Sequence, residues 1–398
     1  MNGRAGRPGQ AQSVHQAVAL VAATLDAAGI DHSRNEALAL VAEAFRRCGE
    51  NVESSDVVRW DILGTSVDGA LGNAVLGDVA TDRSPADRKS HRTTVINAGS
   101  VTSRDDLTAC RQTFRRWLDD AVARRSQREP LQHIVGHVDF YGAEYLVGSG
   151  VFIPRPETEW VVAAAIDWLQ AHHSDRRPIV VDLCAGSGVM GLSVARHLPD
   201  TDVWQVEKDE RAYTWLRRNI VHLRGDGREA CHSYTSDEDN ASVWLSNGSR
   251  VRTLLADAVA PGILIGLNGR VDAVVCNPPY LPESRPIEQP EARQDPPIAL
   301  YGGSADGTAI PRLLVAQASR LLRTNGVLLM EHDITQAEAI RIAFEDAGFQ
   351  HVSVQKDGTH RPRWTQGVRG NDDGTNGHNH AAVDDDREGV KSRRAGRR

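Results

Sequence analysis

The sequence has no apolar run long enough to cross a membrane. The longest run near its start, Ala17 to Leu25, covers only nine residues, whereas a membrane-spanning helix needs about 20. The opening residues 1–12 carry arginines that no apolar core follows, so they do not resemble a secretory signal. We therefore expect a cytoplasmic protein without a segment inserted in a membrane.

Cysteine pairs and an excess of positive charge are also missing. None of the five cysteines forms a C-x-x-C pair, which argues against a zinc ribbon or a disulfide scaffold and fits a reducing compartment. The formal net charge is −7, so a protein that holds nucleic acid by charge alone is not expected. His378 and His380 are spaced like metal ligands but lie in a polar tail, and we predict no metal site.

The first part of the chain shows the spacing of amphipathic helices. One helix is predicted over Val14 to Ala28, ended by Gly29, and another over Leu107 to Arg124. A helix between them opens at Ser33, where Glu36 completes an S-x-x-E capping box. The arginines of the last helix could face RNA, but a solvated helix face is the favoured interpretation; they are Arg111, Arg115, Arg116, Arg124, Arg125 and Arg128.

After residue 178, short β-rich runs alternate with helical stretches. This alternation predicts an α/β fold with a doubly wound, mostly parallel sheet that has helices on both faces. Two late runs are expected to close the sheet as edge strands, at 351–355 and 363–369. The other predicted strands are 179–183, 202–207, 252–256, 271–276 and 326–332, and the predicted helices are 188–197, 211–223 and 310–322.

The chain length of 398 residues suggests two or three domains. Two polar stretches interrupt the patterns and are interpreted as insertions or loops, at 51–103 and 226–250. The predicted organisation is a flexible start (1–12), a small α-helical domain (13–128), a linker that leads into the site (129–177), an α/β domain (178–370) and a disordered tail (371–398).

A glycine-rich turn joins the first predicted strand of the α/β domain to a helix. Gly186, Gly188 and Gly191 match G-x-G-x-x-G, and Glu207 follows at the end of the next strand. Such a turn lets a ligand approach the backbone, and the acid can accept the hydroxyls of a ribose. The pattern favours a cofactor that contains a nucleoside over a turn that only packs strand on helix, without choosing between NAD and S-adenosylmethionine.

Two further acids favour S-adenosylmethionine. Asp182 precedes the glycines, where the pyrophosphate of a dinucleotide would meet an unfavourable negative charge, whereas the amino group of S-adenosylmethionine suits a carboxylate. Asp257 follows the next apolar run and could accept a hydrogen bond from an adenine amino group. Taken alone, Asp257 could equally be a residue that forms a turn or caps a helix.

The run Asn277-Pro278-Pro279-Tyr280 follows a strand at the edge of the sheet that faces the ligand crevice. Two prolines fix φ and remove two backbone donors. The run therefore presents acceptors, the Asn277 side-chain oxygen and the Pro278 carbonyl, beside an aromatic wall from Tyr280. This arrangement suits a planar NH2 group; the alternative, a proline-rich turn, is disfavoured behind the glycine turn and its acids.

Four runs together resemble the HemK/PrmC family. They are EPLQHIVGHVDFYG (129–142), VFIPRPETE (151–159), VDLCAGSG (181–188) and NPPYLP (277–282). Members of this family are N5-glutamine methyltransferases that act on the Gly-Gly-Gln loop of peptide chain release factors. NPPY alone is shared with adenine-N6 methyltransferases of nucleic acids, but RPETE with NPPY is more specific.

The resemblance implies a Rossmann-like class I methyltransferase domain of seven strands behind a helical domain that helps hold the release factor. It assigns S-adenosylmethionine to Cys184, Ala185, Gly186, Ser187, Gly188, Glu207 and Asp257. Asp182, from its charge and position, and Asn277 complete the expected cofactor-binding set. The resemblance assigns catalysis and the substrate glutamine to Asn277, Pro278, Pro279 and Tyr280, with Phe152 and Arg155 at the mouth. Ala258 departs from the family, because some members carry an aromatic residue beside the adenine.

Other readings of the same motifs stay open at this point. Glutamine methylation of a ribosomal protein, adenine-N6 methylation of nucleic acid, and a binding module that has lost its chemistry are the alternatives. Release factors are the expected partner, without membrane or stable nucleic-acid binding. His332, at a strand end, is a candidate base, although a packing or hydrogen-bonding role is favoured.

Overall fold

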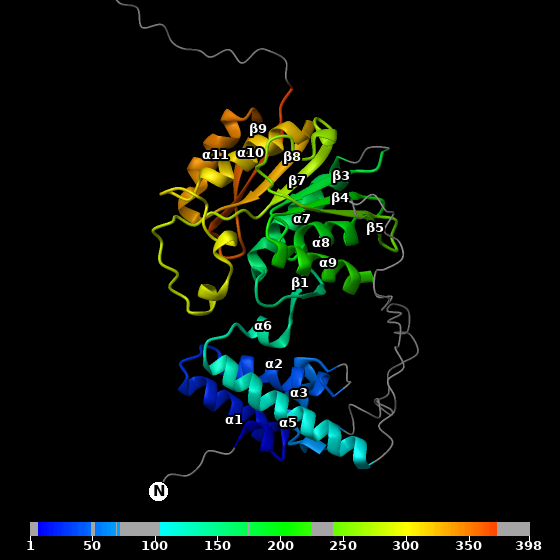
Figure 1. Ribbon diagram of the computed structural model, residues 1–398, viewed down its shortest axis with the longest axis vertical. Helices are drawn as coiled ribbons and strands as arrows, with labels where there is room; N and C mark the ends of the chain where they lie inside the picture. Colours follow the sequence, from blue (N-terminus) through cyan, green and yellow to red (C-terminus); the bar gives the residue numbers. More distant parts are fainter. Residues whose placement is uncertain are drawn as a thin grey trace, which may run out of the picture.

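The computed structural model describes residues 7–48, 52–68, 70–71, 104–172, 176–224 and 242–371. Helices from the first part of the chain gather at one end of the molecule, and a sheet covered by helices forms the other end (Figure 1). The segment that contains α6 (Leu131–Val135) leads from the helices to the sheet. No helix in the described ranges is long and apolar enough to span a membrane.

The helical part is built from four α-helices within the described residues. They are α1 (Val14–Ala27), α2 (Ser33–Arg46), α3 (Ser54–Ile62) and α5 (Arg104–Ser126). Ser13 caps α1, because its side chain accepts a hydrogen bond from the Gln16 N–H. Phe45 lies at the centre of the core, with its ring 5.2 Å from Trp60 and 4.7 Å from Phe114. The helices predicted at 14–28 and 107–124 are confirmed.

Three details of the helical part differ from the prediction. Ser33 does not cap α2; the N-cap is His32 in a left-handed conformation, and Glu36 instead accepts hydrogen bonds from Arg125. Residues 54–62 form α3 rather than a loop, and Glu53 and Asp56 make the capping box there. Arg125 is buried in ion pairs rather than solvated. Within the predicted flexible start, a 3-10 helix η1 spans Pro8–Gln10, and residues 72–103 lie outside the described ranges.

The sheet has eight strands within the described residues, in the order β5-β6-β4-β3-β7-β8-β10-β9. Its five central strands are parallel, and β5, β10 and β9 run antiparallel to their neighbours. The bounds are β3 (Ile179–Leu183), β4 (Asp202–Glu207), β5 (Ser242–Trp244), β6 (Arg250–Leu255), β7 (Val271–Cys276), β8 (Leu322–Glu331), β9 (Phe349–Lys356) and β10 (Pro362–Arg369).

Helices cover both faces of the sheet, as predicted from the alternating pattern (Figure 1). Successive residues of β3 point to opposite faces. Val180 packs in the cluster that includes α7 (Glu159–Ala171) and α8 (Val189–His197), while Val181 packs in the cluster with α10 (Ala309–Leu321) and α11 (Ala337–Asp346). Helix α9 (Glu210–Arg224) joins the first face through Ile220.

Two expectations about the sheet were wrong. The run at 363–369 is not an edge strand, because β10 pairs with β8 on one side and with β9 on the other. The sheet also exceeds the implied seven strands, because β5 lies inside the segment interpreted as an insertion at 226–250 and pairs with β6. Residues 225–241 lie outside the described ranges, as does the tail beyond residue 371 with its two histidines.

The segment 129–177 contains more regular structure than a linker. The hairpin of β1 (His137–Phe140) and β2 (Ala143–Leu146) is followed by a 3-10 helix η3 (Pro156–Thr158) and α7. Phe140 and Tyr145 are buried against the α7 face of the sheet. This segment therefore packs as part of the α/β body while connecting it to the helices.

Candidate active site

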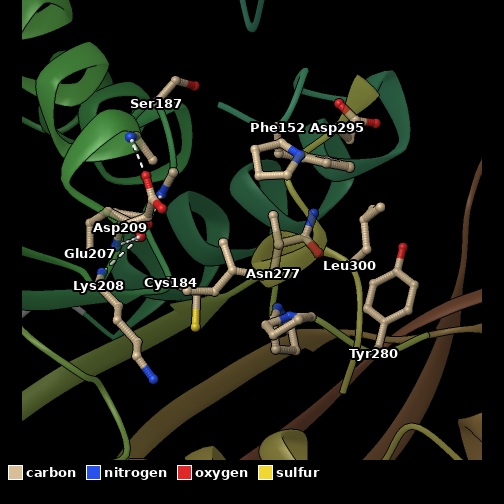
Figure 2. Close-up of a pocket in the computed structure, with 18 of the residues that line it drawn as sticks. Phe152, Cys184, Ser187, Glu207, Lys208, Asp209, Asn277, Tyr280, Asp295 and Leu300 are labelled. Atoms are coloured by element: carbon tan, nitrogen blue, oxygen red, sulfur yellow. Dashed lines mark hydrogen bonds between the residues drawn. The ribbon is translucent and has the colours of Figure 1, made fainter. Parts of the chain in front are cut away.

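A cavity of about 330 Å3 opens at the carboxyl ends of β3, β4 and β7. Chain order reverses between β3 and β7, because β4 and β6 lie on one side of β3 and the later strands on the other. Ligands of open α/β sheets bind at such a switch point. The glycine turn after β3 and the NPPY run after β7 both face this cavity (Figure 2).

The glycine turn presents its backbone to the cavity. Gly186 has a φ of +57°, and a Cβ added there would meet nothing within 4 Å, so the turn borders open space. Gly188 has a φ of +86°, and an added Cβ would lie 2.7 Å from Leu216. Glycine is required at both positions by conformation, and at Gly188 also by packing.

Glu207 ends β4 and holds the glycine turn. One of its carboxylate oxygens accepts from the Gly186 N–H at 2.7 Å, and the other accepts from the N–H groups of Lys208 and Asp209 at 2.8 Å each (Figure 2). Burial raises the pKa of Glu207, while these hydrogen bonds oppose that effect. The carboxylate lines the cavity and keeps lone pairs that a ribose hydroxyl can use.

Asp257 follows β6 on the same side of the cavity. It forms an ion pair with Lys208, with 2.7 Å between Nζ and Oδ2. Burial acts to raise the pKa of Asp257, but the hydrogen bonds from Lys208 and from the Val259 N–H lower it overall. Neighbouring Ala258 also lines the cavity. Lys208 had not been singled out in the sequence, because a lysine after a strand is typical of any exposed loop.

Asp182 lies beneath the turn and does not line the cavity. Its Oδ2 accepts from the Gly191 N–H at 2.9 Å and from Gln205 Nε2 at 3.2 Å. Its Oδ1 is buried with no partner in the described part of the chain. Burial raises the pKa of Asp182 to about 7. Asp182 of β3 therefore fastens the first turn of α8, which follows the glycine turn, to the sheet.

Asn277 and Tyr280 are joined through two buried side chains. Asn277 Nδ2 donates to Thr158 Oγ1 at 3.3 Å, and Thr158 donates to Glu331 Oε2 at 2.7 Å. The Tyr280 hydroxyl donates to Glu331 Oε1 at 3.3 Å. Pro278 and Pro279 are buried between them and line the cavity with both polar residues.

The mouth of the cavity carries Phe152, Arg155 and Asp295. Arg155 stacks over the Phe152 ring at 5.0 Å and pairs with Asp295 across 2.7 Å. Asp295 belongs to the mouth loop, residues 282–300, which returns to the site where Leu300 O accepts from the Tyr280 N–H at 3.0 Å. Burial raises the pKa of Asp295, and Arg155 counteracts this.

Sequence reasoning missed Glu331 and Asp295. Glu331 precedes His332, which was considered instead, and its only signal was its place at the carboxyl end of β8. His332 is fully buried, within hydrogen-bonding distance of Asp333 O and Thr365 Oγ1 at 2.9 Å each. The interpretation of His332 as a hydrogen-bonding residue fits this position. The described residues contain no group of three or more potential metal ligands.

The residues around the cavity fit S-adenosylmethionine. The open backbone at Gly186 can face a close-lying ligand, and the buried Oγ of Ser187, which lines the cavity, finds no partner in the described residues. Glu207 and Asp257 offer carboxylates to the two ends of an adenosine. Together with the sheet order, this site defines the protein as a class I methyltransferase that uses S-adenosylmethionine.

The comparisons with known proteins narrow this class. A family described as "Conserved hypothetical protein 95" matches residues 149–288. The release factor glutamine methyltransferase of Bifidobacterium longum is 45% identical, covering 63% of this chain and 78% of that protein. Its counterpart from Mycolicibacterium smegmatis is 34% identical over 77% of this chain and 98% of that protein. The chain belongs to the release factor glutamine methyltransferase family.

A relative named for a different substrate also matches. The 4-amino-L-phenylalanine/4-methylamino-L-phenylalanine methyltransferase of Streptomyces pristinaespiralis is 36% identical, covering 58% of this chain and 71% of that protein. The two relatives named release factor glutamine methyltransferase cover more of this chain, 63% and 77% against 58%.

Proposed function

We propose that this protein transfers a methyl group from S-adenosylmethionine to the side-chain amide nitrogen, N5, of the glutamine in the Gly-Gly-Gln motif of peptide chain release factors. The observation that carries the proposal is the pair of acceptors in the NPPY run, beside the glycine turn and at the same cavity. Such a pair is what an NH2 group on a planar amide requires. The relatives named release factor glutamine methyltransferase support the same methyl-accepting substrate.

The cofactor would be held by residues of three strand ends. The turn 184–188 receives its amino acid part, Glu207 its ribose and Asp257 its adenine, with Asp182 supporting the turn from below. S-adenosylmethionine supplies a methyl group that is already activated by its sulfonium charge. Lys208, which now pairs with Asp257, lies where the adenine edge would compete for that carboxylate.

The chemical difficulty lies with the amide nitrogen, whose lone pair is delocalised into the carbonyl. Asn277 Oδ1 and the Pro278 carbonyl can each accept one N–H of the substrate, which aims the nitrogen and favours a pyramidal geometry. Positioning of this kind can contribute up to about 7–11 kcal/mol. Tyr280 forms the wall beside the amide. Once the nitrogen has accepted the methyl group from the sulfonium, it loses one of its own two protons to solvent.

The mouth provides room for a loop of a protein substrate. Phe152 and Ile298 present apolar surface there, and Arg155 is fixed by Asp295. The helical part, joined to the mouth loop, offers a second contact surface for the release factor. We also propose that the protein works in the cytoplasm, where its substrate acts.

The decisive experiment combines the protein with labelled S-adenosylmethionine and purified release factors. We expect methyl transfer to the wild-type factor, mass spectrometry to place it on the Gly-Gly-Gln glutamine, and no label on a factor with Gln→Ala in that motif. Label that persists on the Gln→Ala factor would overturn the proposed acceptor. Transfer to DNA, RNA or 4-amino-L-phenylalanine instead of the factor would assign a different substrate.

A further inference from the structure

The side-chain amide of Asn277 must be held in one orientation to serve the proposed reaction. An asparagine amide has a donor end and an acceptor end of nearly the same shape. Only the orientation with Oδ1 toward the substrate provides an acceptor for the substrate N–H. If the amide rotated by half a turn, its own NH2 would face the substrate NH2, and two donors would meet.

Thr158 holds the donor end of that amide away from the substrate. Asn277 Nδ2 lies 3.3 Å from Thr158 Oγ1, and Thr158 is 2% exposed. A hydroxyl can both donate and accept. Thr158 alone would therefore tolerate either end of the Asn277 amide.

Glu331 removes this ambiguity. It is 2% exposed, and an ionised carboxylate is an acceptor only. Thr158 donates its proton to Glu331 Oε2, 2.7 Å away, so when Glu331 is ionised only the lone pairs of Thr158 remain for Asn277. The second oxygen of Glu331 accepts from the Tyr280 hydroxyl at 3.3 Å. One buried carboxylate thus orients both polar ends of the NPPY run.

Hydrogen bonds from Thr158 and Tyr280 offset part of the cost of burying the Glu331 carboxylate. Burying a carboxylate is unfavourable unless it is paired or hydrogen-bonded, and the pKa of Glu331 is raised to about 7 by burial. Its charged neighbours are Glu157, which also raises the pKa, and Arg363, which lowers it. The two side chains that donate to Glu331, Thr158 and Tyr280, both line the cavity.

We propose that Glu331 and Thr158 are positioning residues that fix the Asn277 amide with its oxygen toward the substrate nitrogen. The inference rests on the proposed function, because it takes the substrate nitrogen to be an NH2 group held by Asn277. It adds residues outside the NPPY run, contributed by β8 and by η3, to the reaction. Its chemistry is hydrogen bonding alone, and no bond is made or broken at either residue.

The test compares Thr158→Val, Thr158→Ser and wild type in single-turnover methylation of a release factor, beside calorimetric cofactor affinity. Thr158→Val keeps the shape but removes the hydroxyl, and we expect the rate to fall about 10- to 100-fold, as for supporting partners of functional groups. Cofactor affinity should stay within about threefold, and Thr158→Ser should keep most of the rate. Glu331→Gln should show an intermediate loss, because one of its two ends still accepts.

A double-mutant cycle separates positioning from general damage. If Thr158 acts through Asn277, Thr158→Val should cost almost nothing further in an Asn277→Ala background. Thr365→Val is the matched control, because Thr365 is another fully buried threonine, bonded to His332 at the end of β8, and does not line the cavity. It should lower thermal stability without lowering the single-turnover rate.

Three outcomes would overturn the inference while leaving the proposed function intact. They are a wild-type rate for Thr158→Val, full additivity of its effect with Asn277→Ala, or an equal loss of rate in Thr365→Val. Failure of the wild-type protein to methylate any release factor would instead overturn the proposed function. The two failures are therefore distinguishable in one set of measurements.

Discussion

At the scale of single residues, the residues proposed to bind the cofactor are separate from those proposed to hold the substrate amide. Glu207 and Asp257 lie on the side of the cavity formed by β4 and β6, whereas Asn277 and Tyr280 lie on the side formed by β7. Only the second group reaches the side chains of Thr158 and Glu331. Substitutions on the two sides should therefore change different measured constants.

Asn277→Ala should lower the single-turnover rate while cofactor affinity stays close to that of wild type. Loss of one orienting partner typically costs about 2.7–4 kcal/mol, or 100- to 1,000-fold in rate. Glu207→Ala should do the reverse and weaken cofactor binding first, because three backbone N–H groups lose their acceptor. Calorimetry beside rapid-quench kinetics checks both; near-wild-type turnover of Asn277→Ala would contradict the role of the NPPY run.

Asp182 should make stability depend on pH. Its pKa is about 7 in the folded protein and 3.8 ordinarily, so between these values the folded state binds more protons than the unfolded state. The free energy of unfolding therefore falls as pH rises from about 4 to about 7, by at most about 4 kcal/mol from this residue. The stabilisation that protonated Asp182 contributes to the folded state is complete below about pH 4 and lost above about pH 7.

Asp182→Asn should remove this slope. Denaturant unfolding at a series of pH values would show the variant gaining stability relative to wild type as pH rises. The absolute stability at one pH is less informative, because the new amide places a donor where Asp182 Oδ1 has no partner in the described residues. A difference between the two proteins that stays constant from pH 4 to 7 would contradict the prediction.

At the scale of elements, α5 connects the helical part to the mouth loop. Arg125, 4% exposed, donates to Glu36 of α2 at 2.6 Å and to Glu291 of the mouth loop at 2.9 Å. Arg128 also pairs with Glu291, and its carbonyl accepts from Gln294. The mouth loop, which lines the cavity, is therefore held by α5, a helix of the helical part.

Glu291→Gln should loosen the mouth loop without unfolding the helical part. We expect a higher KM for the release factor, an almost unchanged cofactor affinity and little change in thermal stability. Arg125→Ala should add a loss of about 1.5–3 kcal/mol in the free energy of unfolding, because Glu36 also loses its charged partner. Equal KM values for Glu291→Gln and wild type would show that the contact between the helical part and the mouth loop does not guide the substrate.

At the scale of the whole molecule, cofactor binding should be visible as added stability. A ligand that binds only the folded state, at 100 times its Kd, adds about 2.7 kcal/mol to the free energy of unfolding. We expect S-adenosylmethionine to raise the Tm of wild type and of Asn277→Ala, and to raise that of Glu207→Ala much less. The same shift in all three proteins would contradict the assignment of Glu207 to the cofactor.

The sequence alone was sufficient for the local features of this protein. Strands β3, β4 and β7 lie where their β-rich runs predicted them, because buried parallel strands are rich in β-branched and other apolar residues. The glycine turn and the NPPY run each consist of a few consecutive residues, so their function can be predicted without knowing which distant residues pack against them. Motifs of this kind also carried the resemblance to the family.

Tertiary structure decided whatever depends on residues far apart in the chain. Glu36 appeared to belong to a capping box, but Arg125, 89 residues away, takes its carboxylate. The run at 363–369 gave no sign that it has a strand on each side. Glu331 gained its place beside Thr158, 173 residues away, only through the sheet. Hydrogen-bond partners across such distances are set by packing, which local patterns of polarity do not record.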